Sequence, residues 1–567
     1  MADPYGRRPP SHPPYGRPRH RRPSPNYGRR RLVAGGIALF VVVALVMIGS
    51  SVFGGGQRSP KVKTRLAGNP TSGQATTSHA TKGPANGTQV TPQGVLSTWV
   101  QAENAKPGNA SWAITKPANN HQIEGYADQV SIDVGGHVGL HVSTPAPTFT
   151  VQAFRMGYYG GTQARLVWTS PTVPAKHQPS CPVTSGTNMV QCSWADPVAV
   201  QTNPNDWPQG DYLFKLVSGD GYQSYVPLTI RDDTSHAAYL INNSVTTWQA
   251  YNAFGNYSLY GGPTAAGNNV LAGRAHIVSF DRPYDVTEGS GNGSGDFANQ
   301  ELRMVSLTEQ AGLDVSYTTD VDLHANAQMV THHRVFVSLG HDEYYSSAMR
   351  DGLGSARDAG VNVVFMGANA VYRHIRLQPS PLGANRQEID YKDASLDPTS
   401  SSNPADSTPA AWRSPPNNNP ESSLLGEMWR CNPVQADMVI TDPGNWIFAG
   451  TGLTAGTHLA GAVGPEYDSY RSADPGPKNV EIVASSPVDC VGRSDHADMT
   501  YYTAASGAGV VDTGSIQFIG GVITNAAPGS REAQITQITK NILAAFGQGP
   551  AGHQHPSMPN GTQYPNG

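Results

Sequence analysis

The sequence predicts a mixed α/β fold, with a β-sandwich-like domain preceding a parallel-sheet domain, behind one N-terminal transmembrane helix. Three observations indicate this order. Residues 32–53 carry no charge, residues 93–232 hold short alternating strand patterns, and compact apolar runs begin after residue 236. With 567 residues, the chain has room for two or three domains of about 150 residues each.

Residues 1–31 form an Arg/Pro-rich segment with nine arginines and one acid. Such a segment cannot bury a core, so we expect a disordered cytoplasmic tail. Without it, the totals of 38 basic and 42 acidic residues fall to 29 and 41. Because the remainder is acidic, nucleic acid is not an expected partner of the folded part.

Residues 32–53 are apolar enough and long enough to cross a lipid bilayer as a helix. Arg29, Arg30 and Arg31 abut the N-terminal end of this run, so the positive-inside rule predicts a cytoplasmic N-terminus and extracellular C-terminal domains. The expected location is therefore the cell membrane, with a single pass. A cleaved signal peptide is the alternative, although no A-x-A-like site follows the run.

Residues 54–92 are rich in Gly, Ser, Thr, Pro and Ala, which is typical of a flexible linker. The β-rich region at 93–232 contains runs such as "TFTVQAFRMGYYGG" and "GDYLFKLVSGDGYQSYVPLTIRDD". Short strands separated by Gly-rich turns favour a sandwich. We expect Trp168, Trp194 and Trp207 to belong to its core, and a sugar-binding platform is the alternative.

Four cysteines occur, and all lie beyond the apolar run, where disulfides persist. We expect a Cys181–Cys192 disulfide to close a short hairpin. We expect a Cys431–Cys490 disulfide to link a long segment back to the rest of the domain. Free buried thiols are the alternative. None of the four has metal-ligand spacing.

The region at 236–547 has a different pattern. Its runs "AAYLIN", "AHIVSF", "LDVSYTT", "HRVFVSLG" and "VNVVFMGA" are of the kind buried on both faces of a parallel sheet, and helix-compatible stretches such as 301–311 and 346–358 separate several of them. A closing helix follows Ser530, a good N-cap. Residues 378–435 read as an insertion, and the tail at 548–567 as disordered.

Ligands bind beyond the carboxyl ends of the strands in open parallel sheets. Polar and aromatic side chains follow each of the five runs in this sequence. They are Trp248, Tyr251, Tyr257 and Tyr260; Asp281, Arg282 and Tyr284; Asp320 and Asp322; His341, Asp342 and Glu343; and Asn369, Tyr372, Arg373 and His374. We therefore expect one crevice lined by these groups.

The chemistry open to this crevice is limited. No cysteine follows a strand, and no G-x-S-x-G elbow or phosphate-binding Gly-rich loop is present in a suitable context. Carboxylate, imidazole and phenol remain. The segment "GHDEYYS" at 340–346 therefore suggests a cation site, and an acidic helix N-terminus is the alternative.

Six motifs carry a resemblance to a known family: "FRMGYYGG", "VTTWQAYNAFGNYSLYGG", "SFDRPY", "GHDEYYS", "GANAVYRHIRL" and "AGTGL". Over about 150–545 the chain resembles the C-terminal domain of the N,N-dimethylformamidase large (beta) subunit. The resemblance implies a glutamine-amidotransferase-like α/β domain beside a β-rich one. It also implies a mononuclear iron held by two tyrosines and one glutamate.

Carried over residue by residue, the resemblance gives Glu343 as the carboxylate ligand. It gives Tyr251 and Tyr284, each after a strand end, as the tyrosine ligands. The expected catalytic residues are His341, Asn369 and Glu466. Two tyrosinates and a carboxylate make a hard oxygen-donor set that suits a trivalent cation.

The implied function is metal-dependent hydrolysis of an amide-type C–N bond in a small amide or envelope-derived substrate. The dimethylformamidase works with a small partner subunit that this chain does not contain, and the anchor suggests a different substrate. The alternatives are a non-catalytic envelope- or glycan-binding protein and a glycoside hydrolase. The oligomeric state stays open, a homo-oligomer included.

Overall fold

The computed structural model describes residues 87–563 except 265–268. The described residues all belong to one compact unit, Thr81–Gly567. The expected cytoplasmic tail, transmembrane helix and most of the linker lie outside the described residues. Within the described residues, no helix is both long enough and apolar enough to span a bilayer.

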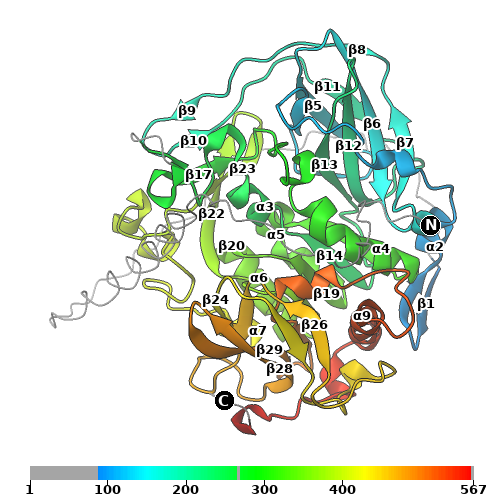
Figure 1. The fold of residues 1–567 in the computed structure, drawn as a ribbon, viewed down its shortest axis with the longest axis vertical. Helices are drawn as coiled ribbons and strands as arrows, with labels where there is room; N and C mark the ends of the chain where they lie inside the picture. Colours follow the sequence, from blue (N-terminus) through cyan, green and yellow to red (C-terminus); the bar gives the residue numbers. More distant parts are fainter. Residues whose placement is uncertain (1–86, 265–268, 564–567) are drawn as a thin grey trace, which may run out of the picture. The chain divides into compact units, whose positions relative to one another are not determined.

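Two stacked sheets form the N-terminal part of the described chain (Figure 1). One sheet has the order β11 (Val198–Gln201), β5 (His137–Ser143), β3 (Glu124–Ala127). The other has the order β4 (Ser131–Asp133), β13 (Gln223–Arg231), β12 (Gly210–Ser218), β6 (Thr148–Met156), β7 (Ala164–Thr169), with β8 (Val173–Pro174) paired to β6. Apolar side chains from both sheets, including Leu140 and Phe214, share one buried cluster, as face-to-face packing requires.

The three tryptophans of this region take different places. Trp207 is buried in the cluster between the sheets, and Trp168 packs against the same cluster. Trp194 is buried elsewhere, beside Tyr126 and Phe254. These positions agree with a packing role rather than with an exposed sugar platform.

The hairpin that precedes these sheets begins inside the predicted linker. Strand β1 (Thr88–Thr91) pairs antiparallel with β2 (Gly94–Ser97), and helix α2 (Thr98–Asn104) follows directly. The tyrosine hydroxyl of Tyr239 accepts a hydrogen bond from the backbone of Val95, which ties the hairpin to the central sheet. A tertiary contact therefore orders a segment whose composition is typical of a linker.

A seven-stranded sheet forms the centre of the described residues. Its order is β18 (Val315–Thr319), β14 (Tyr239–Asn243), β19 (Val335–Gly340), β21 (Asn362–Gly367), β30 (Gly509–Asp512), β29 (Arg493–Thr503), β28 (Glu481–Cys490). The first five strands run parallel, and the last two pair antiparallel. Four of the five predicted apolar runs are thus neighbours in one sheet. The predicted likeness to a glutamine amidotransferase stays a prediction.

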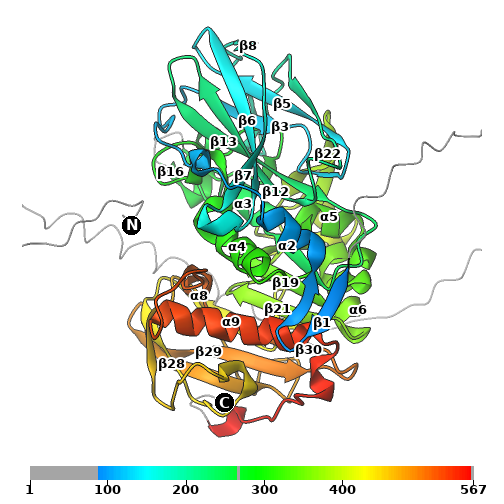
Figure 2. The same ribbon diagram turned by 90° about the vertical axis from the view of Figure 1, so that its right-hand side faces the viewer.

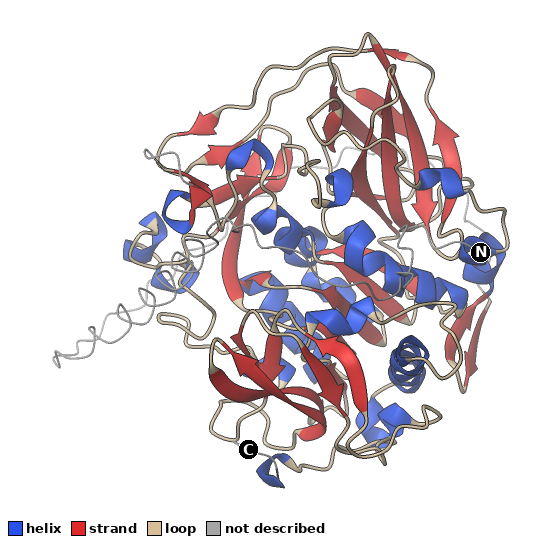
Figure 3. Ribbon diagram, in the orientation of Figure 1, coloured by secondary structure: helices blue, strands red, loops and turns tan. Residues whose placement is uncertain are grey.

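Helices cover both faces of this sheet (Figures 2 and 3). They are α3 (Val245–Tyr251), α4 (Leu302–Gln310), α5 (Asp320–Ala325), α6 (Ser347–Asp358), α8 (Ile516–Gly520) and α9 (Arg531–Gly547), with the short α7 (Ser422–Leu425) further out. Along β19, Val335 and Val337 join the cluster that includes Ile535 and Ile542 of α9, while Phe336 joins the cluster of α6. Because successive side chains point to opposite faces, a strand covered on both sides carries apolar side chains on both faces, as Val335, Phe336 and Val337 show.

The predicted start of the closing helix is confirmed. The hydroxyl of Ser530 accepts a hydrogen bond from the backbone N–H of Ala533 at 3.2 Å. This contact satisfies one of the free amides at the helix N-terminus.

The prediction that all five apolar runs form neighbouring strands is wrong for "AHIVSF". Strand β17 (Ile277–Ser279) lies in a separate four-stranded sheet of order β17, β23 (Gly383–Ile389), β22 (Arg373–Ser380), β20 (Tyr344–Ser346). It pairs antiparallel with β23. The pairing partner comes from the predicted insertion at 378–435, which local sequence pattern did not show to contain a strand.

Four two-stranded pairings complete the described strands. They are β9 (Val183–Thr184) with β10 (Met189–Val190), β15 (Gly262–Pro263) with β16 (Asn269–Val270), β24 (Met428–Cys431) with β27 (Tyr467–Ser469), and β25 (Ala436–Val439) with β26 (His458–Val463).

Both predicted disulfides are confirmed. Cys181 and Cys192 bracket the β9–β10 hairpin, with their Cα atoms 4.5 Å apart. Cys431 of β24 is bonded to Cys490 of β28, with a Cα–Cα distance of 6.4 Å. The second bond ties the segment after α7 to the edge strand of the central sheet.

The described part of the C-terminal tail, residues 548–563, differs from its prediction as a disordered segment. Ala551 is buried in the main core cluster, and the His555 ring stacks on Trp446 with centroids 4.8 Å apart. The hydroxyl of Tyr501 also donates a hydrogen bond to the backbone oxygen of His555. The low-complexity composition of this segment gave no indication of these contacts, which hold the chain against the core.

Candidate active site

The candidate site begins where β19 ends. Gly340 has a φ of 63°, a conformation that glycine adopts without a steric penalty, and it turns the chain out of the strand. The backbone N–H of Glu343 then donates to the hydroxyl of Thr247 at 2.9 Å, and the N–H of Arg373 donates to the backbone oxygen of Glu343 at 2.8 Å. These bonds fix Glu343 between α3 and β22, with its residue only 1% exposed.

Two tyrosines converge on the Glu343 carboxylate. The hydroxyl of Tyr251, the last residue of α3, donates to Oε2 at 2.9 Å. The hydroxyl of Tyr260 lies 2.7 Å from Oε1 and 2.8 Å from Oε2. The two rings stack with centroids 4.3 Å apart, which aligns both phenol oxygens toward one carboxylate.

A polar network lies on the other side of Glu343. His341 Nε2 is 3.4 Å from Glu343 Oε2 and 4.0 Å from Glu466 Oε2, so the imidazole stands between two carboxylates. The side-chain amide of Asn369 donates to Glu466 Oε2 at 2.8 Å and lies 3.4 Å from His341 Nε2. The amide of Asn432 donates to the second oxygen, Oε1, at 2.8 Å.

The backbone at Asn369 is held in an unusual conformation. Its φ is 58°, in the left-handed region that asparagine tolerates better than most residues. Its N–H donates to Asp468 Oδ1 at 2.9 Å. This bond fixes the turn after β21 and directs the side-chain amide of Asn369 toward Glu466 and His341.

Positive groups surround the Glu343 carboxylate. Burial alone would raise the pKa of Glu343, but His341, Arg373 and Lys392 outweigh burial, so the pKa lies below its ordinary value. Arg373 Nε donates to Glu343 Oε1 at 3.1 Å. Lys392 Nζ lies 4.1 Å from the centre of the Tyr260 ring and donates to the hydroxyl of Tyr344 at 2.6 Å.

The pKa of the Glu466 carboxyl is shifted in the opposite direction. Burial raises its pKa, His341 lowers it and Glu343 raises it, with a net shift above the ordinary value. Glu343 is therefore the better ionised of the two carboxylates, whereas Glu466 holds a proton more readily. Such a divergence within one site is typical of acid–base machinery.

The structure brings Tyr251, Glu343, His341, Asn369 and Glu466 together, but it does not bring Tyr284 to them. The Tyr284 ring packs edge-on against Trp248 at 6.2 Å, and no described contact joins it to Glu343. The reason is that β17, which precedes Tyr284, belongs to the separate antiparallel sheet. Its carboxyl end does not lie at the edge of the central sheet.

Tyr260 lies beside Glu343, where the family resemblance led us to expect Tyr284. The signal was available in part, because Tyr260 follows the same strand as Tyr251, within one aromatic loop. Arg373 directly precedes His374 in the motif "GANAVYRHIRL", whereas Lys392 lies in the insertion, where sequence pattern gave no indication of a site. All three touch Glu343 or one of its tyrosine neighbours.

The site opens to solvent on the side of Tyr251. This residue is 39% exposed, whereas Glu343 is fully enclosed. A groove beside it is lined by Trp248, Tyr284 and the acidic residues Asp285 and Asp296, among others. A substrate would therefore approach Glu343 past the Tyr251 ring.

The donor set is of a kind that can hold a hard metal ion. Both phenol oxygens lie within hydrogen-bond distance of the same carboxylate, and hard oxygen donors of this kind suit a trivalent cation. In the described part of the chain, no group of three or more His, Cys, Asp or Glu side chains is arranged to hold a metal ion. Tyrosine phenols, a different type of donor, supply two of the three candidate ligands.

Comparisons with solved structures give only weak likenesses. The chain is similar to a cycloisomaltooligosaccharide glucanotransferase of Paenibacillus sp., complexed with cycloisomaltoheptaose, at 9% identity over 45% of this chain and 56% of that one, with a TM-score of 0.15. It is similar to murine CEACAM1b at 12% identity over 19% of this chain and 52% of that one, with a TM-score of 0.11. The chain thus spans about half of each structure, and at such scores neither likeness identifies a fold.

The family comparison is more specific. No curated protein matches the chain. The sequence model of one family, described as "N,N-dimethylformamidase beta subunit-like, C-terminal", matches residues 150–528. This range is more than half of the chain and includes every residue of the site described above. The chain therefore belongs to the N,N-dimethylformamidase beta subunit-like, C-terminal family.

Proposed function

We propose that this protein hydrolyses an amide-type C–N bond and that Tyr251, Tyr260 and Glu343 hold an iron ion for this purpose. The observation that carries the proposal is the convergence of two phenol oxygens on one buried carboxylate, with hydroxyl–carboxylate distances of 2.7–2.9 Å. Membership of the family supports the reaction class. The substrate is a small amide or an envelope-derived molecule.

The site's own residues account for the handling of the proton and of the amide. A bound iron would supply Lewis-acid chemistry, polarising a carbonyl and lowering the pKa of water. His341, between Glu343 and Glu466, is placed to move a proton from water toward the leaving amine. Glu466, whose pKa burial raises, holds that proton between steps. The Asn369 amide donates to an oxygen that gains negative charge.

The proposed location is the outer side of a cell membrane, with residues 32–53 as the anchor. Two disulfides in the described residues support an oxidising environment. The uncharged run next to Arg29–Arg31 supports a helix that keeps the N-terminus in the cytoplasm.

The decisive experiment uses the purified full-length chain. Elemental analysis should find iron, and the protein should be coloured by a tyrosinate-to-iron charge-transfer band. Tyr260→Phe should weaken the band and lower the iron content, whereas the matched variant Tyr284→Phe should keep both. Equal loss of iron in the two variants would contradict the ligand assignment.

Activity is measured as amine release from a panel of small amides, with iron-loaded wild type beside Glu466→Gln. The expected result is release by the wild type and a loss of about 10²–10⁴-fold in the variant, the usual contribution of a general acid–base group. A colourless, iron-free protein that binds glycan and releases no amine would instead favour the non-catalytic alternative.

A further inference from the structure

The groove beside Tyr251 has room for a small molecule. Its volume is about 320 Å³, at the lower end of the range of ligand sites. The end of α3 and the loop that follows β17 supply its lining. Tyr251 belongs both to this lining and to the partners of Glu343. A molecule held in the groove therefore lies next to the candidate active site, and the chemistry of the groove bears on the choice of substrate.

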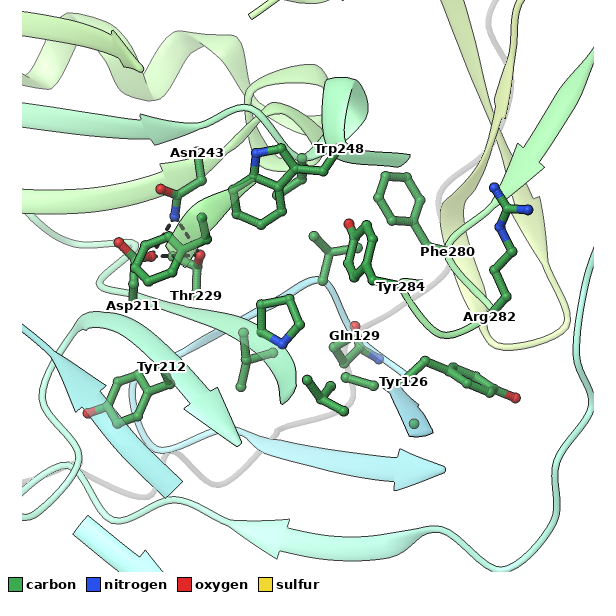
Figure 4. Close-up of a pocket in the computed structure, with 18 of the residues that line it drawn as sticks. Tyr126, Gln129, Asp211, Tyr212, Thr229, Asn243, Trp248, Phe280, Arg282 and Tyr284 are labelled. Carbon is green, nitrogen blue, oxygen red and sulfur yellow. Dashed lines mark hydrogen bonds between the residues drawn. The ribbon is translucent and has the colours of Figure 1, made fainter. Parts of the chain in front are cut away.

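The glycine-rich stretch at 289–295 contributes to one wall of the groove. Gly295 has a φ of 59°, and a Cβ atom on it would stand 2.9 Å from Cε3 of the Trp248 ring. Glycine alone combines this backbone conformation with so close an approach. The Trp248 ring in turn packs edge-on against Tyr284, with ring centroids 6.2 Å apart (Figure 4). This packing fixes the end of the loop, and the next residue, Asp296, lines the groove.

The groove carries negative charge. Three carboxylates line it, those of Asp285, Glu288 and Asp296, and its lining contains no lysine or arginine among the described residues. Asp285 accepts bonds from the backbone N–H of Thr287 at 3.0 Å and from the Thr287 hydroxyl at 2.9 Å. Glu288 is exposed, and the side chain of Asp296 accepts no hydrogen bond from the described part of the chain. Because none of the three forms an ion pair there, the groove is suited to a cation from outside.

Asp296 connects the groove with the catalytic residues. Burial raises the pKa of the Asp296 carboxyl and the imidazole of His341 lowers it, with a net rise. Because the interaction between charges weakens with distance, this influence places the two side chains near each other. His341 Nε2 in turn lies 3.4 Å from Glu343 Oε2. A short chain is therefore enough to join a cation at Asp296 to a bond held beside Glu343.

We propose that the substrate is a small amide that carries a cationic group, and that the groove binds this group through Asp285 and Asp296. The apolar stem between the cation and the amide lies against the ring of Tyr251, which is 39% exposed. Glu288, the exposed acid of the lining, attracts the cation from solution. This inference rests on the proposed hydrolase function and restricts its substrate, since a neutral or anionic amide gains nothing from the three carboxylates.

The test compares three amides built on the same short chain: β-alaninamide, which is cationic, butyramide, which is neutral, and succinamate, which is anionic. In each reaction the oxygen of water bonds to the acyl carbon as the C–N bond breaks, which yields a carboxylate and an ammonium ion. Ammonium release by the iron-loaded full-length protein is measured at about pH 7.5, where primary amines are protonated. We expect kcat/KM to be about tenfold or more higher for β-alaninamide than for butyramide, and lowest for succinamate, because a charged hydrogen bond contributes about this factor.

Variants of the groove test the assignment of the residues. Asp296→Asn should lower the ratio of kcat/KM for β-alaninamide to that for butyramide about tenfold, and Asp285→Asn should lower it as well. Glu288→Gln, at an exposed position where folding is not at risk, should lower the same ratio about two- to threefold through the loss of long-range attraction. The matched control Asp196→Asn, exposed and outside the groove, should keep the wild-type ratio.

A binding measurement separates this inference from the hydrolase proposal. Calorimetric titration of the full-length protein with the same three amides, before it is loaded with iron, measures binding apart from hydrolysis. Saturable binding that is tightest for β-alaninamide, without ammonium release after loading, would support the cation site and contradict the hydrolase. Ammonium release with equal kcat/KM for β-alaninamide and butyramide would overturn the cation site and leave the hydrolase intact. The cation site is also overturned if no amide binds saturably, or if the folded groove variants keep the wild-type ratio.

Discussion

Two buried glutamates, Glu309 and Glu343, show how similar contacts serve different ends. Glu309 receives two bonds from Arg155, at 2.5 and 2.9 Å, and one from the hydroxyl of Tyr317 at 2.6 Å. Glu343 receives bonds from the hydroxyls of two tyrosines and a single contact from Arg373. Both carboxylates are almost fully enclosed.

The difference lies in the partners. Arg155 belongs to β6 and Glu309 to α4, so their bidentate pair joins the sandwich to the helices of the central sheet and neutralises the carboxylate. Around Glu343 two phenols donate beside a single contact from Arg373, and Tyr251 is 39% exposed whereas Tyr317 is 1% exposed. We infer that the bidentate pair with Arg155 makes Glu309 structural, and that the phenols at an opening leave Glu343 available for chemistry.

The largest expected effect is on metal binding. Glu343→Gln should remove iron from the protein, since it replaces the anionic ligand by a neutral amide, while Glu309→Gln should retain iron as the wild type does. Elemental analysis of the two purified variants measures this. Retention of iron by Glu343→Gln would erase the functional distinction between the two residues.

The reverse pattern is expected for stability. Glu309→Gln leaves the fully buried Arg155 without its charge partner, so the free energy of unfolding should fall by about 3–5 kcal/mol. Urea denaturation followed by circular dichroism gives this value. A smaller loss than that of Glu343→Gln, both measured without iron, would contradict the structural role.

A third buried carboxyl, that of Asp468, extends the comparison to the pH dependence of stability. It accepts a hydrogen bond from the backbone N–H of Asn369. Burial raises its pKa to about 7, against an unfolded value near 4. Between about pH 4 and 7 the folded state binds this extra proton, so Asp468 contributes a fall in stability of about 1.4 kcal/mol per pH unit as pH rises. Asp468→Asn should make the slope of stability against pH, taken from unfolding curves, less steep by about this amount. An unchanged slope would show that Asp468 does not titrate in that range.

The smallest effect concerns the hydroxyls. Tyr317→Phe removes one bond to Glu309 and should cost about 1.5–3 kcal/mol of stability, as for a hydrogen bond to a charged group, without changing the absorption spectrum. Tyr260→Phe should change the spectrum of the iron-loaded protein. Thermal unfolding measures the stability of both variants, and visible absorption measures their spectra. Equal stability losses together with equal spectral changes in the two variants would contradict the different roles of Glu309 and Glu343.

Sequence reasoning located much of the site because strand ends carry local signals. His341 and Glu343 follow an apolar run that becomes β19, and Asn369 follows the run that becomes β21. It misplaced Tyr284, because the run before it has the same apolar character as its neighbours yet pairs with β23. Strand partners depend on contacts between distant segments, which local pattern does not report.

The sequence alone determined the family, the two disulfide pairs, the main strands and the cap of α9, since each depends on residue type and spacing along the chain. Only the tertiary structure decided that Tyr260 and not Tyr284 meets Glu343, and that Lys392 comes from the insertion to cover the Tyr260 ring. These features depend on which distant segments pack together, and packing is set by the whole fold.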